Sequence, residues 1–418
     1  MSTAPGEEPA PAASRMESLK AVERADVYKG DSLAAHLTRT ADGRIEFAYA
    51  TEWVTAGGEP VASTLPVSPD PVVVGGGAVP AFFAGLLPEG RRLAALRRSV
   101  KTSADDELSL LLAVGGDTVG DVRVVPSGAG LQTVAPRLDV SHPAELSFRE
   151  LLRDVGIRVD RVGLPGVQDK VSAAMLNVPV RSAHAQLLLK LDPPEFAHLV
   201  ENEMFFLRAA GGAGIRTVDA RVITDAEGLP GLAVTRFDRV SRTDSPGAIA
   251  LAVEDGCQAL GLPPSEKYRV STERLLSALC RLCEAPVVAA AEFLAQVAYA
   301  FLTGNGDAHA KNFSVMRDLD GRWQPAPAYD LPSSFFYGDH TMALSIDGRS
   351  DGDIAGSRFV ALGSALGVRP AAAQKILRRV AASADAWVDT LEELPFDEAR
   401  RRKFARVVRH RQGIMTRF

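Results

Sequence analysis

Hydrophobic and polar positions alternate in short runs near the start of the chain. DVYKGDSLAAHLTRT and GRIEFAYA have the two-residue period of half-buried strands. Helical spacing follows in AVPAFFAGLLPEGRRLAALRRSV and DDELSLLLAVGG, and DVRVVP is again strand-like. The pattern predicts a mixed α/β subdomain over residues 25–143. Residues 1–24 begin with an Ala-, Pro- and Ser-rich stretch that predicts a disordered leader.

The pattern changes over residues 144–240. A helix in SFRELLRDVGIRV leads to a glycine-containing turn, and two strands, a helix in ENEMFFLRAAGGAGI and a third strand follow. From about Gly261 onward the spacing is almost entirely helical. One interruption, NFSVMRDLDGRWQPAPAYDL, predicts a hairpin that turns at Asp320-Gly321 and whose second strand ends at Asp330. We therefore predict an α+β fold with an all-helical region at 241–418.

Composition excludes several classes of protein. The 418 residues are 46% hydrophobic and 24% charged, which excludes collagen-like, fully disordered and small disulfide-stapled chains. The three cysteines favour a reducing cytoplasm, and we expect Cys280 and Cys283 to be helix core positions rather than zinc ligands. The formal net charge of −5 argues against a surface built to bind nucleic acid or an anionic membrane. The chain has no uninterrupted run of 18 apolar residues, so we predict no membrane span.

The strongest chemical signal is GNGDAHAKNFSVMRDLDGRWQPAPAYDL. Asp307 and Asn312 have the D-x-x-x-x-N spacing with which kinase catalytic loops hold a base and a metal ligand. The hairpin would return Asp330 to the same place as a second oxygen ligand for Mg²⁺. These residues also favour turns and caps, which is the alternative explanation for their presence.

Upstream residues would complete a nucleotide site. Lys190 ends the apolar run LLLK and could reach phosphates, although a lysine at a sheet edge is an ordinary alternative. Glu203 could pair with Lys190, with Glu201 as the competitor. GLPGVQDK could wrap a phosphate with backbone amides, but it does not have the spacing of a Walker A loop. Phe237, after the strand in AVTRFDR, could pack beside an adenine or belong to the core.

A basic helix closes the chain. Asp397 is its expected N-cap and Gly413 its expected end. From Arg400 onward there are eight Lys or Arg and no acidic residue, so the rest of the chain is more acidic than its net charge suggests. The cluster Arg400, Arg401, Arg402 and Lys403 would be a solvated face or a contact to DNA or an acidic partner.

Together, these motifs resemble the HipA-type serine/threonine kinases, the toxins of HipBA toxin–antitoxin modules. The matching segments run in family order: FFAGLLPEG, VGGDTVGDVRVVP, GLPGVQDK, LLLK, NEMFFL, TRFDR, EDGCQALGLPPSEKY, GDAHAKNFS and YDL. The resemblance implies a bilobal protein-kinase-like fold with an N-terminal β-rich subdomain, an N-lobe-like region at 144–240 and a helical lobe at 241–418. It also implies ATP and Mg²⁺ as cofactors.

The resemblance assigns Asp307 as catalytic base and Asn312 and Asp330 as metal ligands. The implied ATP-binding residues are Pro165, Gly166, Val167, Gln168, Asp169, Lys170, Lys190, Thr235, Arg236, Phe237, His309 and Lys311. Members of the family phosphorylate an aminoacyl-tRNA synthetase, typically the glutamyl enzyme, which inhibits translation and induces dormancy. A small helix-turn-helix HipB-like antitoxin that binds operator DNA neutralises them. A small-molecule kinase and a catalytically silent co-repressor are the alternative functions.

One position departs from the family pattern. Where the family commonly has a serine that becomes autophosphorylated and switches the kinase off, this chain has Gly163. No Ser or Thr lies between Arg161 and Val171, so such a switch is absent or uses another hydroxyl such as that of Ser172. Phosphopeptide mapping after incubation with ATP distinguishes the two.

Overall fold

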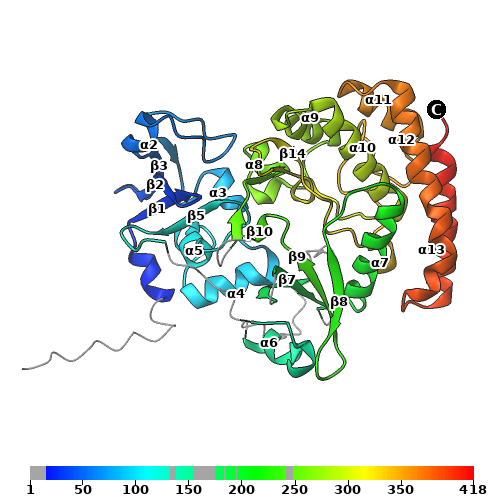
Figure 1. Ribbon diagram of the computed structural model, residues 1–418, viewed down its shortest axis with the longest axis horizontal. Coiled ribbons are helices and arrows are strands. Elements are labelled where there is room, and N and C mark those ends of the chain that lie inside the picture. The colour runs from blue at the N-terminus through cyan, green and yellow to red at the C-terminus, as the bar shows by residue number, and fades with distance from the viewer. Residues whose placement is uncertain (1–15, 132–137, 155–174, 183–184, 194, 242–247) are drawn as a thin grey trace, which may run out of the picture. The chain divides into compact units, whose positions relative to one another are not determined.

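A computed structural model describes residues 16–131, 138–154, 175–182, 185–193, 195–241 and 248–418 (Figure 1). The chain divides into two compact units. One comprises Met1–Val61 and Leu65–Val134, and the other comprises Ala62–Thr64 and Ala135–Phe418. Each unit is described by itself below.

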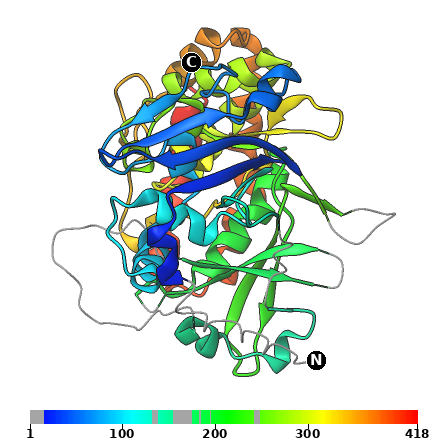
Figure 2. The ribbon, with the colours of Figure 1, turned by 90° about the vertical axis from the view of Figure 1, so that its left-hand side faces the viewer.

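The first unit is built on an antiparallel sheet with the strand order β4-β3-β2-β1-β5. The strands are β1 (Arg24–Lys29), β2 (Ser32–Arg39), β3 (Ile45–Tyr49), β4 (Val72–Val74) and β5 (Val122–Pro126), and most are blue in Figure 2. The helices are η1 (Leu19–Ala21), α2 (Thr51–Thr55), α3 (Ala81–Gly85), α4 (Gly90–Val100) and α5 (Glu107–Val114). Alternate strand residues such as Val27, Leu37 and Phe47 are buried, and Phe47 packs on Phe83 of α3, as the two-residue period predicts.

The second unit begins with η2 (Pro143–Glu145) and α6 (Phe148–Asp154), followed by a four-stranded antiparallel sheet of order β6-β7-β9-β8. Its strands are β6 (Leu176–Arg181), β7 (Gln186–Leu191), β8 (Ala220–Thr224) and β9 (Pro230–Thr235). Helix α7 (Leu199–Gly212) connects β7 to β8 and buries Phe205, Phe206 and Leu207 in the large core of the unit. Strand β7 of this sheet carries Lys190, and α7 carries Glu203.

The remainder of this unit is mainly helical. Its longer helices are α9 (Thr272–Leu282), α10 (Pro286–Thr303), α11 (Gly356–Ala365), α12 (Pro370–Ser383) and α13 (Glu398–Met415). Its short helices are α8 (Gly256–Ala259), η4 (Pro264–Glu266), η5 (Ala310–Asn312), η6 (Ser334–Tyr337), η7 (Ala384–Ala386) and η8 (Val388–Glu393). Helices α11, α12 and α13 lie beside α10 (Figure 1), whose residues Phe293, Leu294 and Phe301 are fully buried.

The prediction of an all-helical region at 241–418 is wrong. A ribbon of β10 (Arg239–Ser241) and β11 (Ala248–Ala250) precedes a three-stranded antiparallel sheet of β12 (Val253–Asp255), β13 (Ser314–Arg317) and β14 (Trp323–Pro325). The predicted hairpin is therefore present, but β12 adds to it a strand that is too short to show a period in sequence.

Two predicted element ends also differ. Strand β14 ends at Pro325 rather than Asp330, because Ala328 leaves the hairpin to exchange backbone hydrogen bonds with Arg216 and Val218. Helix α13 begins after Asp397, whose carboxylate caps it as predicted, but it continues through Gly413 to Met415. Gly413 does not end the helix, because Met415, two residues later, is buried and holds the last turn of the helix against the core. Glycine permits a helix to end but does not require it.

Helix α10 is long and apolar enough to cross a membrane by length and composition, the one such helix among the described residues. Most of it is buried inside the protein, as in the central helix of a folded core. Cys280 in α9 and Cys283 just after it are also buried, and both thiols are free. Burial raises the pKa of Cys280 to about 11, so its thiol stays protonated and inert near neutral pH.

Candidate active site

Lys190 contacts two acidic residues, which lie 13 and 140 positions later in the chain. Its ammonium, on buried strand β7, is 2.6 Å from Glu203 Oε1 of α7 and 3.1 Å from Asp330 Oδ1. Glu203 is fully buried, whereas Glu201, the competing partner, is half-buried and lies 3.7 Å from His198. Helical geometry explains the choice, since Glu203 shares the inward face of α7 with Phe206 and Ala210.

Asp330 is held on its other side by Asn312. The Asn312 side-chain amide donates to Asp330 Oδ2 at 2.9 Å, and Asn305 donates to the Asp330 backbone carbonyl at 3.2 Å. Asp330 has a φ of 58°, in the left-handed region that is unfavourable for residues with a side chain. The structure keeps this conformation because three hydrogen bonds, from Lys190, Asn305 and Asn312, fix the residue.

Electrostatics in this cluster follow from burial and charge. Burial would lower the pKa of Lys190, but Asp330 and Glu203 outweigh it and raise that pKa above its ordinary value. Burial raises the pKa of Glu203 to about 7, because nearby Asp330 adds to the effect and Lys190 offsets only part of it. The pKa of Asp330 is lowered despite burial, chiefly by Lys190. Asp330 is therefore the carboxylate that stays ionised at neutral pH.

Asp307 reaches the site on the loop that follows α10. That helix is followed by Gly304, whose φ of 67° turns the chain in a conformation that glycine adopts easily. Asn305 Oδ1 then accepts the Asp307 backbone N–H at 3.1 Å, while the same side chain reaches Asp330. Asn305 thus fixes the spacing between the two aspartates.

Tyr268 is a site residue that the sequence did not reveal. Its hydroxyl donates to Asp307 Oδ1 at 2.5 Å, and its ring makes an edge contact with His309 at 5.0 Å between centroids. Tyr268 lies 39 positions before Asp307 in a loop without secondary-structure spacing. Tyr268 ends the family-matching segment EDGCQALGLPPSEKY, but that match does not indicate its partner, so only the fold could identify this contact.

The segment predicted as an adenine hinge follows β9. Phe237 stacks on Tyr329, the neighbour of Asp330, at 5.7 Å between ring centroids. The backbone N–H groups of Thr235 and Arg236 donate to Asp219 and Gln186, and the Arg236 guanidinium forms a buried pair with Asp238 at 2.9 Å. Phe237 is therefore near the site, while these two amides and the Arg236 side chain already have partners within the protein.

The remaining predicted residues fall into three groups. His309 is buried beside Tyr268, and Lys311 lies 3.7 Å from Asp255, the residue that caps α8. Residues 165–170 and Gly163 lie outside the described residues. Arg400 to Lys403 lie on α13, and no contact within the described part of the chain joins them to Lys190, Glu203 or Asp330. Arg401 donates to the carbonyls of Glu392 and Leu394, and Arg402 pairs with Glu398.

The donor set at Asn312 and Asp330 fits a hard cation. Among the described residues there is no group of three or more His, Cys, Asp or Glu arranged to hold a metal ion. Mg²⁺ commonly takes only one or two protein oxygens and completes its shell with water and phosphate. A lysine paired with a helix glutamate, an aspartate and asparagine at one point, and a second aspartate on the preceding loop are the groups that phosphoryl transfer by a kinase requires.

Comparison with known proteins agrees with this class. Residues 162–388 match the HipA-like C-terminal domain, and residues 25–125 match the HipA N-terminal domain. The chain belongs to the HipA family of kinases. The resemblance seen in the sequence is thereby confirmed.

Two similar proteins and one solved structure illustrate the relationship. Y4mE of Sinorhizobium fredii, which is named as a kinase, is 29% identical over 93% of this chain and 98% of its own length. The serine/threonine-protein kinase toxin HipA of Shewanella oneidensis is 28% identical over 78% of this chain and 79% of its own. The structure of a Shewanella oneidensis complex of HipA, HipB and operator DNA matches with a TM-score of 0.73 and 25% identity, covering 94% of this chain and 96% of that one.

Proposed function

We propose that the protein is an ATP- and Mg²⁺-dependent serine/threonine protein kinase. The observation that carries the proposal is the buried contact of Lys190 with both Glu203 and Asp330, with Asn312 on the same carboxylate. In kinases this lysine contacts phosphates and the helix glutamate orients it. A buried lysine between two acids is costly in a purely structural role, which supports its use in binding phosphate.

Asn312 and Asp330 would hold Mg²⁺. An ionised carboxylate offers about four acceptor positions, and Lys190 and Asn312 occupy two of those of Asp330. Bound Mg²⁺ would neutralise charge on the transferred phosphate. The low pKa of Asp330 keeps this ligand ionised.

Asp307 would orient the hydroxyl of the acceptor and take its proton as the phosphate is transferred. Its carboxylate is almost fully buried and is directed by the Tyr268 hydroxyl, so its position is set before the acceptor binds. Most of the rate would come from positioning and from charge stabilisation by Lys190.

The biological role that we propose is that of a toxin in a type II toxin–antitoxin module in the cytoplasm. Family membership and the similarity to a kinase toxin support it, as does the likeness to a HipA–HipB–operator complex. The partner would be a HipB-like helix-turn-helix antitoxin, with operator DNA reached through it. The family resemblance favours an aminoacyl-tRNA synthetase, glutamyl type, as substrate. A bilobal layout of sheet and helical lobes completes the proposal.

The test is phosphoryl transfer by the full chain. Wild-type protein with Mg²⁺ and γ-labelled ATP should label glutamyl-tRNA synthetase on serine or threonine, and Asp307→Ala should abolish the transfer while it leaves ATP affinity and folding largely intact. Transfer by Asp307→Ala near the wild-type rate would overturn the assignment of the base.

A further inference from the structure

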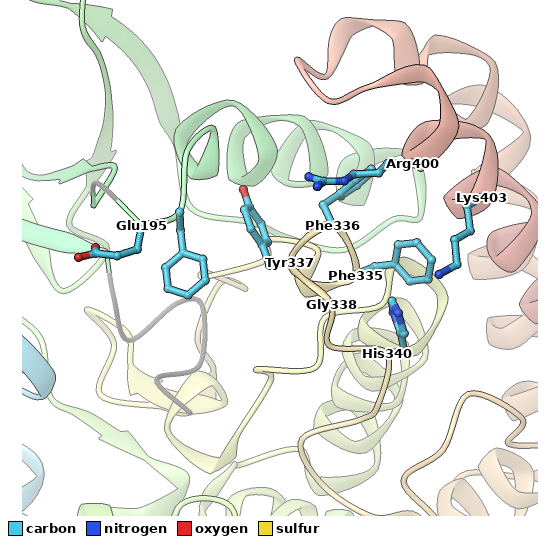
Figure 3. A pocket seen from close by; sticks show the side chains of 9 residues that line it. Glu195, Phe335, Phe336, Tyr337, Gly338, His340, Arg400 and Lys403 are labelled. Carbon is cyan, nitrogen blue, oxygen red and sulfur yellow. The ribbon is translucent and has the colours of Figure 1, made fainter. Parts of the chain in front are cut away.

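A cavity of about 450 Å³ lies between the loop before α7, helix η6 and the start of α13. Its lining residues are Glu195, Phe196, Phe335, Phe336, Tyr337, Gly338, His340, Arg400 and Lys403, and we call it the α13 cavity. In Figure 3, Arg400 and Lys403 extend from α13 over Phe336 and Phe335, and Glu195 lies at the opposite end. The cavity therefore has an aromatic floor and a cationic end.

The cationic end has the chemistry of a carboxylate site. The Lys403 ammonium lies over the Phe335 ring, 5.7 Å from its centroid, and has no carboxylate in ion-pair contact within the part of the chain that the structure describes. Arg400 is paired at 3.1 Å with Asp397, but both side chains are more than half exposed, so the pair is weak and can exchange partners. Burial lowers the pKa of His340, Lys403 and Arg411 lower it further, and Asp339 offsets part of this effect.

The wall of the cavity also supports the catalytic loop. Ser334 Oγ accepts the Gly306 backbone N–H at 2.8 Å, and the Ser334 N–H donates to the Gly304 carbonyl at 3.0 Å. A Cβ on Gly306 would lie 2.6 Å from Asp339 Oδ2, so the loop and the segment are closely packed. One short segment thus carries the aromatic floor and fixes the loop that bears Asp307.

Buried Arg411 strengthens this link. Its guanidinium donates to the carbonyl of Phe301, in the last turn of α10, at 2.7 Å and to that of His340 at 2.9 Å. Helix α13 therefore holds both the cavity wall and the helix end from which the catalytic loop starts. A ligand in the α13 cavity would be bound close to the loop that presents the base.

We propose that the α13 cavity binds an acidic side chain of the protein substrate, in a segment that flanks the phosphorylated hydroxyl. The inference rests on the proposed protein kinase function and adds a substrate class to it. A cavity of this size fits a side chain and its neighbours, whereas a DNA duplex is contacted by protruding cations along its backbone. The acidic character of the chain outside α13 also disfavours a long nucleic acid on this face.

The experiment measures binding without requiring transfer. A short fluorescent peptide with one serine flanked by glutamates is compared, by anisotropy, with a twin that has glutamines in place of the glutamates. Wild-type full chain should bind the glutamate peptide about tenfold more tightly, a usual size for close interfacial charge pairs. The double variant Arg400→Glu, Lys403→Glu should lose this preference and favour a lysine-flanked peptide instead.

The matched control is Arg406→Glu, since Arg406 is also an exposed cation of α13 but does not line the cavity. It should keep the preference for glutamate. An equal loss in Arg406→Glu, an unchanged preference in the double variant, or a loss confined to binding of a short DNA duplex would each overturn the inference. Phosphorylation of casein by the same preparations reports on the proposed kinase function separately: if the wild type phosphorylates casein but shows no preference for the glutamate peptide, only the substrate class is overturned.

Discussion

Asp330 and Asp307 belong to one site, but different kinds of group hold them. Asp330 accepts hydrogen bonds from the charged Lys190 and from Asn312, and its pKa is lowered. Asp307 Oδ1 accepts a hydrogen bond from the neutral hydroxyl of Tyr268, on a loop that Asn305 ties to Asp330. The difference suits two tasks: a ligand for a cation must be ionised and fixed, whereas a base must be directed towards the proton that it takes.

The largest effect is expected when the charge of Lys190, which contacts Asp330, is removed. Lys190→Met leaves Glu203 buried without its cation, which should cost about 3 kcal/mol of unfolding free energy and abolish transfer. The measurement is denaturant unfolding together with a transfer assay.

A double variant separates stability from function. Lys190→Met with Glu203→Leu removes both charges of the buried pair, so most of the lost stability should return while transfer stays absent. If the double variant is no more stable than Lys190→Met alone, the stability lost in Lys190→Met does not come from leaving Glu203 without its cation. That result would contradict the electrostatic explanation of the Lys190–Glu203 pair.

A smaller effect is expected when the hydrogen bond from Tyr268 to Asp307 is removed. Tyr268→Phe removes one hydrogen bond to the base, so kcat should fall about tenfold with ATP affinity unchanged. Tyr329→Phe is the matched control, since the same atom is removed beside Asp330, where it donates to the Lys311 carbonyl. We expect that control to cost about 1 kcal/mol of stability with little change in rate. Equal kcat values for Tyr268→Phe and wild type would contradict a positioning role for Tyr268.

The smallest effect is a pH dependence of stability. Because folding raises the pKa of Glu203 from 4.5 to about 7, its contribution is fully present below pH 4.5 and is lost as pH rises through about 7. Asp330, with a lowered pKa, contributes in the opposite sense, and its stabilisation is lost only in acid. Unfolding free energies of Glu203→Gln should lack the decline across the Glu203 window. If the unfolding free energy of Glu203→Gln declines as much as that of the wild type, another titratable group causes the decline.

The sequence predicted the parts of the site that have local patterns. The spacing of Asp307 and Asn312, the hairpin and the strand that ends near Lys190 are all readable within a few residues, and the structure brings Lys190, Asn312 and Asp330 together. The choice between Glu201 and Glu203 depended on which face of α7 is buried, and the sequence favoured Glu203 only weakly.

The rest depended on contacts between distant segments. Tyr268 reaches Asp307 across 39 positions, and Arg411 reaches the carbonyl of Phe301 across 110. Neither contact leaves a periodic or compositional signal. Strand β12 was missed because its three residues pair with β13 some 60 positions later, so tertiary pairing rather than propensity makes it a strand.

The most direct test of the division between the two aspartates is a Mg²⁺ titration of ATP affinity in Asp330→Asn and Asp307→Asn, with transfer measured on the same samples. We predict that Asp330→Asn loses the gain in ATP affinity that Mg²⁺ gives the wild type, whereas Asp307→Asn keeps this gain but loses transfer by a factor of about 10³. The same response to Mg²⁺ in both variants, or rapid transfer by Asp307→Asn, would contradict the account.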